Sequence, residues 1–505
     1  MSASLETIFR LRAWREGKPL RHGEKINVFV ADDDDLMVIS FLRMGGESRP
    51  WGVAIGNCGT NPKVLTVPDG RNRTLVADMM ADFGSTLLSF FRHPAYSMES
   101  PANYETDSPR QIWLPGPTHV EMLHFLALAY ARTRFQREDV ELLRSLGNLA
   151  NCLYIEQQRP GQQTVISAAA ALRDAYYFPS AAIRQAHLGH LLGWLNGGTS
   201  RDQRLAAATE AEELSIATTL EPELERKTLE PEVERWNEAR KTNDESAMTA
   251  SASAINRSLS KELVRRWQLT CDSIQQLRND RRRPNPGLLN LVNSGKSKFY
   301  WLWGEQALRE HDGKQPYWPN VYTDKHPRTS ARRFILRNAE SEEARFHLVH
   351  GDRELQREVL AAGHGVIATV VKVDKSKPNW KLTYSYPDFP TFNTGKKLEL
   401  AGFPSMKLIV DDVDLETRTF TATPNWTFAK PRLGPLALAS KDKVWEKRQL
   451  VLLSDSNYDL TNRLARRLGA STDGAPDIID LIRPSSRFQA ANDDEGPVSE
   501  PSEQA

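Results

Sequence analysis

The sequence predicts a multidomain α+β protein. Three observations carry this prediction: the chain is 505 residues long, short β-like runs stand in its N-terminal and C-terminal parts, and amphipathic helical segments fill the middle. A single hydrophobic core rarely serves more than about 250–300 residues, so a chain of this length is expected to divide into several domains. Hydrophobic residues make up 40% of the chain and charged residues 26%, values typical of globular proteins.

Residues 1–95 are expected to form a β-rich domain followed by a helix. Four runs, KINVFVA, LMVISFL, WGVAIGN and KVLTVP, are separated by clusters of Asp, Gly, Ser and Pro, which is typical of strands joined by turns. From residue 73 to 93 apolar residues recur near helical spacing. The Pro-rich stretch at 95–117 interrupts this pattern and predicts a boundary.

Residues 118–278 are predicted to be an all-α domain. Segments with amphipathic spacing follow one another, and Gly-Pro or Gly-Gly pairs punctuate the loops between them. Within this domain LEPELER is followed by LEPEVER, and each proline suits the first turn of a helix. The stretch 205–245 is mainly acidic, which is usual for a solvated helix face but also suits a surface that recruits partners.

Residues 279–345 read as a basic, aromatic-rich connecting region. Arginine and lysine dominate from 278 to 337, and Phe299, Tyr300, Trp301 and Trp303 stand among them. Cations interleaved with aromatic rings can hold phosphates and stack on bases. The commoner alternative is that such rings are buried in a core.

A short match to a phosphate-binding loop stands in this region, at Gly295-Lys296-Ser297. The complete GxxxxGK[ST] motif needs a first glycine, because the tight turn there aims backbone N–H groups at the phosphates. That position is Asn290, and no downstream segment offers an obvious carboxylate for Mg²⁺. The sequence therefore predicts a polar turn and not a nucleotide site.

The C-terminal part is expected to contain a small β-barrel over residues 346–455. Runs such as GVIATVVKV, WKLTYSY and MKLIVDDV have period-two alternation and are separated by turns, enough for five or six strands. A helical segment is expected at 456–484. The polar, acidic residues 485–505 have little to bury and predict a disordered tail.

Two segments resemble known families. HGDRELQREVLAAGHGVIATVVKVD, residues 350–374, together with the strands after it, resembles the OB-like or small β-barrel accessory regions found beside superfamily 1 helicases. The ATPase motifs are missing, so this resemblance implies an accessory role in which another protein supplies the motor. In AIRQAHLGH, Arg184 and His190 match the R-x(4–6)-H pattern of HEPN-type ribonucleases. That resemblance implies proton transfer by the histidine and charge stabilisation by the arginine.

Other chemistry finds little support in the sequence. His187 and His190 could share a metal ion, but no third ligand stands nearby, and both the G-x-S-x-G elbow of hydrolases and the dinucleotide-binding fingerprint are missing. We therefore expect no metal and no cofactor. The sequence favours a non-catalytic protein and leaves open a catalytic site assembled from residues far apart in the chain.

The remaining composition bears on location. Cys58, Cys152 and Cys271 lie far apart without CxxC spacing, which favours a reducing compartment. No signal peptide or membrane span is evident. We expect a cytoplasmic protein that does not enter a membrane; its formal charge of +1 gives no global attraction to nucleic acid.

The expected function is that of a non-catalytic accessory protein, in DNA repair or phage defence, which binds nucleic acid or a helicase or nuclease partner. The residues expected to contact phosphates are Lys296, Lys298, Arg332, Arg333, Lys381, Lys396 and Lys397, and those expected to stack on bases are Trp301, Trp303, Trp380 and Tyr384. Two alternatives stay open. One is a ribonuclease that uses Arg184 and His190, and the other is a protein-interaction scaffold that uses the acidic stretch and the tail.

Overall fold

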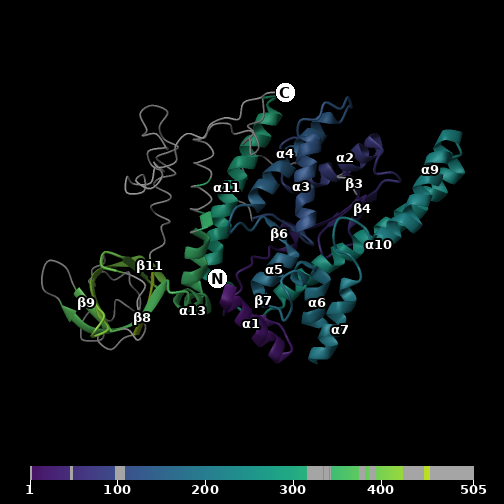
Figure 1. Ribbon diagram of the computed structural model, residues 1–505. Helices are drawn as coiled ribbons and strands as arrows, with labels where there is room; N and C mark the ends of the chain where they lie inside the picture. Colours follow the sequence, from purple (N-terminus) through teal and green to yellow (C-terminus); the bar gives the residue numbers. More distant parts are fainter. Residues whose placement is uncertain are drawn as a thin grey trace, which may run out of the picture. The chain divides into compact units, whose positions relative to one another are not determined.

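The computed structural model describes residues 3–45, 49–96, 109–314, 334, 340–341, 343–374, 381–385, 393–424 and 449–454, and it confirms a mixed α+β protein (Figure 1). The chain divides into two compact units, one formed by Met1–Tyr317 with Glu343–Asp455 and the other by Trp318–Glu342 with Ser456–Ala505. Every helix and strand named below belongs to the first unit. The helical segment predicted at 456–484 and the predicted tail lie outside the described residues.

A five-stranded sheet has the order β4-β3-β2-β5-β6. Its strands are β2 (Leu36–Arg43), β3 (Pro50–Gly56), β4 (Lys63–Thr66), β5 (Gln111–Leu114) and β6 (Val165–Ser167). The first three are antiparallel neighbours, whereas β5 runs parallel to β2, and β6 runs parallel to β5. The sheet thus takes strands from both sides of the boundary predicted at 95–117. β6 also lies inside the stretch for which the sequence predicts helices alone, because three residues are too few to show a strand period.

Helices cover both faces of this sheet (Figure 1). On one face are α2 (Arg73–Phe90), α3 (Pro117–Tyr130) and α4 (Val140–Gln157), and the ring of Phe41 on β2 lies 5.6 Å from that of Phe83 on α2. On the other face is α10 (Glu245–Arg278), where Ser40 on β2 donates to the Leu263 carbonyl at 2.9 Å. Because both of its faces are buried, β2 is an almost continuous apolar run.

Short elements surround the sheet. α1 (Ala3–Glu16) precedes β1 (Leu20–Arg21), which pairs with β7 (Tyr176–Tyr177), and α5 (Ala168–Ala175), α6 (Leu188–Asn196) and α7 (Arg201–Glu212) lead toward α10. The prediction that the prolines of LEPELER and LEPEVER lie in first helical turns is confirmed. Pro222 lies in the first turn of α8 (Pro222–Leu224) and Pro231 in that of α9 (Glu230–Thr242). Asn243, with φ of 55°, ends α9 and lets it form a hairpin with α10.

α11 (Pro286–His311) is one continuous helix. It contains Gly295, Lys296 and Ser297, so the turn predicted there is wrong. The apolar residues on both sides continue the helix, and the single glycine is not enough to end it. α11 packs against α4, and its Phe299 and Trp303 are buried in the main core.

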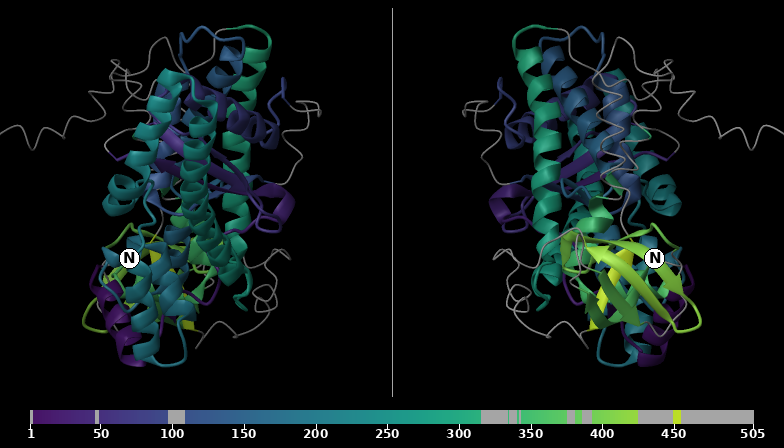
Figure 2. Two further views of the ribbon diagram at one scale, coloured as in Figure 1. Left: turned by 90° about the vertical axis from the view of Figure 1, so that its right-hand side faces the viewer. Right: turned by 90° about the vertical axis from the view of Figure 1, so that its left-hand side faces the viewer.

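The C-terminal strands form a closed barrel of order β10-β11-β12-β9-β8-β13, visible in green and yellow in the right-hand view of Figure 2. Its strands are β8 (Gly365–Asp374), β9 (Lys381–Ser385), β10 (Lys397–Leu400), β11 (Phe403–Asp414), β12 (Thr419–Pro424) and β13 (Gln449–Ser454). Every pairing is antiparallel. Val366, Ala368 and Val370 alternate inward along β8. An OB-fold has five strands in a partly open barrel, whereas this barrel has six and is closed.

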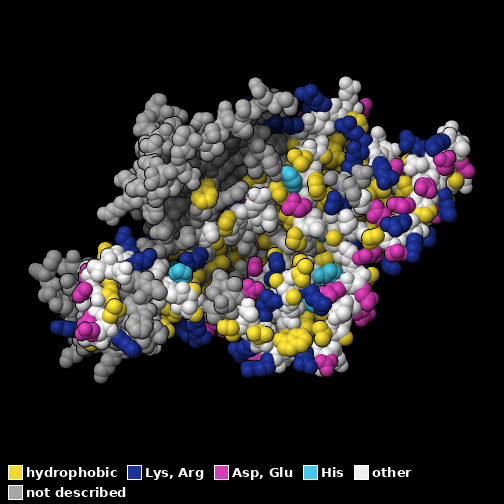
Figure 3. All heavy atoms as spheres, in the orientation of Figure 1, with side chains coloured by type: hydrophobic (Ala, Val, Ile, Leu, Met, Phe, Trp, Pro, Cys, Tyr) yellow, Lys and Arg dark blue, Asp and Glu magenta, His cyan; other side chains and the backbone are white. Residues whose placement is uncertain are grey.

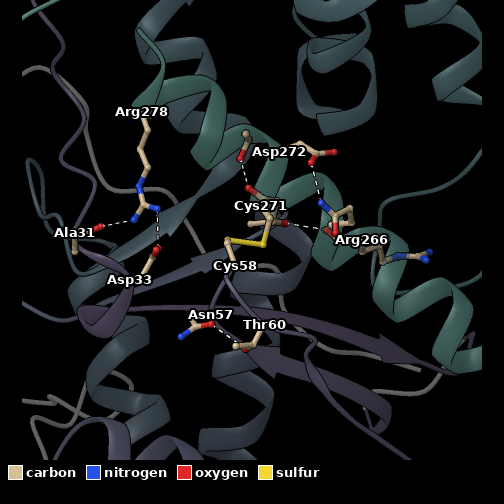
Figure 4. Close-up of a disulfide and its surroundings, with 12 residues drawn as sticks. Ala31, Asp33, Asn57, Cys58, Thr60, Arg266, Cys271, Asp272 and Arg278 are labelled. Carbon is tan, nitrogen blue, oxygen red and sulfur yellow. Dashed lines mark hydrogen bonds and ion pairs between the residues drawn. A yellow bond between two sulfur atoms is a disulfide. The ribbon is translucent and has the colours of Figure 1, made fainter. Parts of the chain in front are cut away.

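A disulfide joins the sheet to α10 (Figure 4). Cys58 follows β3 and is bonded to Cys271 of α10, 213 residues further along the chain. The expectation that the cysteines stay reduced is therefore wrong for this pair. Spacing within the sequence could not reveal the bond, because packing of α10 on the sheet brings the two thiols together. Cys152 is buried and free.

Candidate functional site

Two of the predicted phosphate contacts lie side by side on the barrel. Lys396 and Lys397 are both exposed at the start of β10, and Lys397 is opposite Ile409 of β11, whose side chain is 41% exposed. Within the part of the chain that the structure describes, neither lysine forms an ion pair. Their ammonium groups are therefore available to an anionic partner, next to an apolar side chain.

The barrel separates this lysine pair from the predicted contacts on β9. Lys381 and Tyr384 lie on β9, and three steps around the six-stranded barrel separate β9 from β10 in either direction. Position 384 pairs in register with Val370 and Phe420, both of which are buried. The predicted contacts on β9 and β10 therefore lie on opposite sides of the barrel and do not make one continuous binding face.

Charge on the visible barrel surface is mixed. On the face shown in Figure 3, the described atoms of the barrel carry dark blue basic groups beside magenta carboxylates. Beneath this surface, Lys407 forms an ion pair with the buried carboxylate of Glu399 at 3.1 Å. The visible face of the barrel is therefore not uniformly basic, and attraction to nucleic acid there would come from individual cations.

Trp303 cannot stack on a base, so its predicted role is wrong. Its side chain is fully buried, its indole N–H donates to the Phe91 carbonyl at 3.2 Å, and its ring lies 5.6 Å from that of His93. The alternative prediction, that these aromatic rings are buried in a core, is correct for Trp303, because α11 packs against α4. Lys296, Lys298 and Trp301 lie on the same helix, but their side chains are not described, and Arg332, Arg333 and Trp380 lie outside the described residues.

Arg184 and His190 lie on separate elements and approach the same carboxylate. Arg184 lies on the short helix η3 (Arg184–Ala186) and His190 on α6, with His187 capping α6 between them. Both side chains approach Glu212 at the end of α7, His190 at 3.0 Å and Arg184 at 3.8 Å. Burial lowers the pKa of His190, although the charge of Glu212 opposes this shift.

The His190 imidazole has no exposed surface. A general acid or base must come within hydrogen-bond reach of the reacting group. This arrangement is therefore typical of a buried structural histidine and does not favour RNA cleavage at this position.

The acidic stretch 205–245 is largely used inside the chain. Glu225 accepts two hydrogen bonds from the Gly45 N–H, at 2.9 and 3.1 Å, and Glu221 accepts one from the Ser215 N–H. Other acidic residues pair with nearby cations on the same helical segment, among them Glu232 with Arg235 and Glu238 with Lys241. These contacts reduce the negative surface that the scaffold hypothesis requires.

The crevice where parallel sheets commonly bind ligands is filled by the chain itself. The chain passes from β2 to its neighbour β3 on one side, and from β5 to its neighbour β6 on the opposite side. The two connections therefore diverge between β2 and β5, and the crevice lies at the carboxyl ends of these two strands. There His119 of α3 accepts from the Phe41 N–H and bonds the Ile216 carbonyl at 2.9 Å. The buried Arg266 of α10 donates to the carbonyls of Ala217 and Thr219. Neither side chain stands in a recognisable motif, because the partners of both lie far away along the chain.

No group of three or more His, Cys, Asp or Glu side chains that could hold a metal ion exists among the described residues. The described helices include none that is long and apolar enough to cross a membrane. No protein-family model, no curated protein and no solved structure matches this chain.

Proposed function

We propose that this chain is a non-catalytic accessory protein that binds single-stranded nucleic acid at its barrel, beside a helicase or nuclease that supplies the catalysis. The exposed, unpaired lysine pair at 396–397, next to exposed Ile409, supports the proposal. Lysine ammonium groups neutralise phosphates and release counterions, and an adjacent apolar side chain can contact a base or sugar.

The ribonuclease alternative is weaker than this accessory role. It requires His190 to reach a scissile phosphate, and that side chain is enclosed by the protein. The scaffold alternative is also weaker, because many carboxylates of the acidic stretch already have partners within the chain.

Binding of a labelled single-stranded oligonucleotide, measured by fluorescence anisotropy over a range of salt concentrations, tests the proposal. We expect the affinity to fall as salt rises. The double variant Lys396→Gln/Lys397→Gln should bind several-fold more weakly and lower the slope of log affinity against log salt by about 1.4, since each phosphate contact contributes about 0.7 for a single strand.

Lys372→Gln is the matched control. Lys372 is also an exposed lysine of the barrel, but it lies on β8, which is not adjacent to β10. Binding that is equal in the double variant and the wild type would refute the proposed surface. Absence of binding even at low salt, together with copurification of a helicase or nuclease, would instead favour a role through protein contacts alone.

A further inference from the structure

A pocket of about 470 Å³ lies beside the sheet, between the start of β3, the first turn of α2 and the second half of α3. Small-molecule sites commonly have volumes of about 300–1,000 Å³. The pocket is near the end of the sheet where β2 passes into β3. None of its lining residues belongs to the barrel, and His119 and Arg266 of the filled crevice do not line it.

The walls of the pocket are mostly apolar. Val76 of α2 and Phe125, Leu126 and Leu128 of α3 line it, and Leu128 keeps 64% of its surface exposed. Val76 and Leu126 are buried, whereas Phe125 is half-buried, so Phe125 and Leu128 present the apolar surface that water contacts, which is unfavourable. A ligand that covers them would therefore gain affinity from its apolar part.

Two arginines at the pocket lack carboxylate partners in the described part of the chain. Arg49 donates to the Arg71 carbonyl at 3.0 Å, and the Arg73 guanidinium lies 4.2 Å from the centre of the Phe135 ring. Both side chains are exposed. They leave positive charge beside an apolar wall, where a guanidinium can bind a phosphate or carboxylate through two parallel hydrogen bonds.

The nearby Arg137 shows the contrast. It pairs with Asp139 at 2.6 Å and with Asp78 at 2.7 Å, so its charge is neutralised within the protein. Arg137 therefore holds structural elements together, whereas no described carboxylate neutralises Arg49 or Arg73, so they can bind a group from outside.

Tyr130 adds a neutral hydrogen-bond donor. Its side chain lines the pocket and forms no hydrogen bond with any other described residue. Burial raises the pKa of Tyr130 to about 12, even though Arg49, Arg137 and Arg73 favour the phenolate. The phenol therefore stays protonated at neutral pH and can donate to an anionic oxygen.

We propose that this pocket binds a small organic anion that has an apolar, planar body and one phosphate or carboxylate group. The body lies against Phe125 and Leu128, and the anionic group lies between Arg49 and Arg73 within reach of Tyr130. This inference is independent of nucleic-acid binding at the barrel.

The test is titration calorimetry of the whole chain with 1-naphthyl phosphate, compared with inorganic phosphate and with 1-naphthol. We expect naphthyl phosphate to bind at least tenfold more tightly than either fragment, because only the intact molecule uses both the apolar wall and the cations. Arg49→Gln and Arg73→Gln should each weaken its binding by about tenfold, the loss of one charged hydrogen-bonding partner.

Two further variants complete the experiment. Ala129→Trp starts from an exposed position at the pocket and should abolish binding by filling it, without changing the charge. Arg257→Gln removes an exposed arginine of α10 that does not line the pocket, and it should bind as the wild type does. Circular dichroism checks that each variant is folded. Binding of naphthyl phosphate that survives Ala129→Trp, or no binding by the folded wild type, would overturn the proposal.

Discussion

At the scale of single residues, His119 links three separate parts of the chain. Its Nδ1 accepts from the Phe41 N–H at 3.0 Å, so its Nε2 carries the hydrogen that bonds the Ile216 carbonyl. The ring is fully buried, and that burial lowers its pKa to about 3. His119 is therefore neutral in the folded protein, and its protonation would break the bond to the Phe41 N–H.

This histidine predicts a loss of stability in mild acid. The folded pKa lies below the ordinary value of 6.5, so the unfolded chain binds the proton first and stability falls as pH drops below that value. From pH 7 to pH 5 the contribution of His119 should fall by about 2 kcal/mol. Urea unfolding at both pH values checks this. Between pH 7 and pH 5 the free energy of unfolding of His119→Asn should fall by about 2 kcal/mol less than that of the wild type. An equal fall in the two proteins would contradict the neutral, buried state of His119.

At the scale of elements, the helices depend on how closely they approach one another. A Cβ on Gly147 of α4 would come within 2.2 Å of the Ala131 backbone nitrogen, just after α3. The atoms nearest to a Cβ on Gly295 of α11 would be those of the Arg159 guanidinium, which is paired with Glu156. Both glycines lie inside helices, where alanine has the higher intrinsic propensity.

Gly147→Ala should therefore destabilise the protein by about 3 kcal/mol, because overpacking between two backbones has no easy relief. Gly295→Ala should destabilise the protein less, because the end of a side chain shifts more easily than a backbone and alanine favours the helix, even though the shift disturbs the ion pair of Arg159 with Glu156. Chemical unfolding of the two variants beside the wild type makes the comparison. If Gly147→Ala proved as stable as Gly295→Ala, the close approach of α3 and α4 would be wrong.

At the scale of the whole molecule, the disulfide connects the N-terminal strands to the long helix α10. A crosslink over 213 residues removes much freedom from the unfolded chain. The double variant Cys58→Ser/Cys271→Ser should lower the free energy of unfolding by about 2–5 kcal/mol. Thiol titration in denaturant gives a direct check, since one thiol, Cys152, should react without reductant and all three cysteines after reduction. Three reactive thiols in the untreated protein would mean that the bond does not form.

Much of the fold could be predicted from local patterns. LMVISFL, GVIATVVKV and the segment 73–93 contain enough residues to show a strand or helix period, and the structure has strands or a helix there. β5 and β6 are too short to show one, and their place beside β2 depends on partners far along the chain. For the same reason one sheet joins regions that the sequence separates with a Pro-rich stretch.

The candidate sites divide in the same way. The sequence by itself determined the mixed α+β class and the placing of prolines in the first turns of α8 and α9. It also determined that two lysines are adjacent at 396–397. Each of these features depends on neighbours along the chain. Only the tertiary structure decided that Trp303 is a core residue, that Cys58 meets Cys271, and that Arg49, Arg73 and Tyr130 surround one pocket. Burial and proximity arise when distant segments pack together, and no local pattern of residues carries that information.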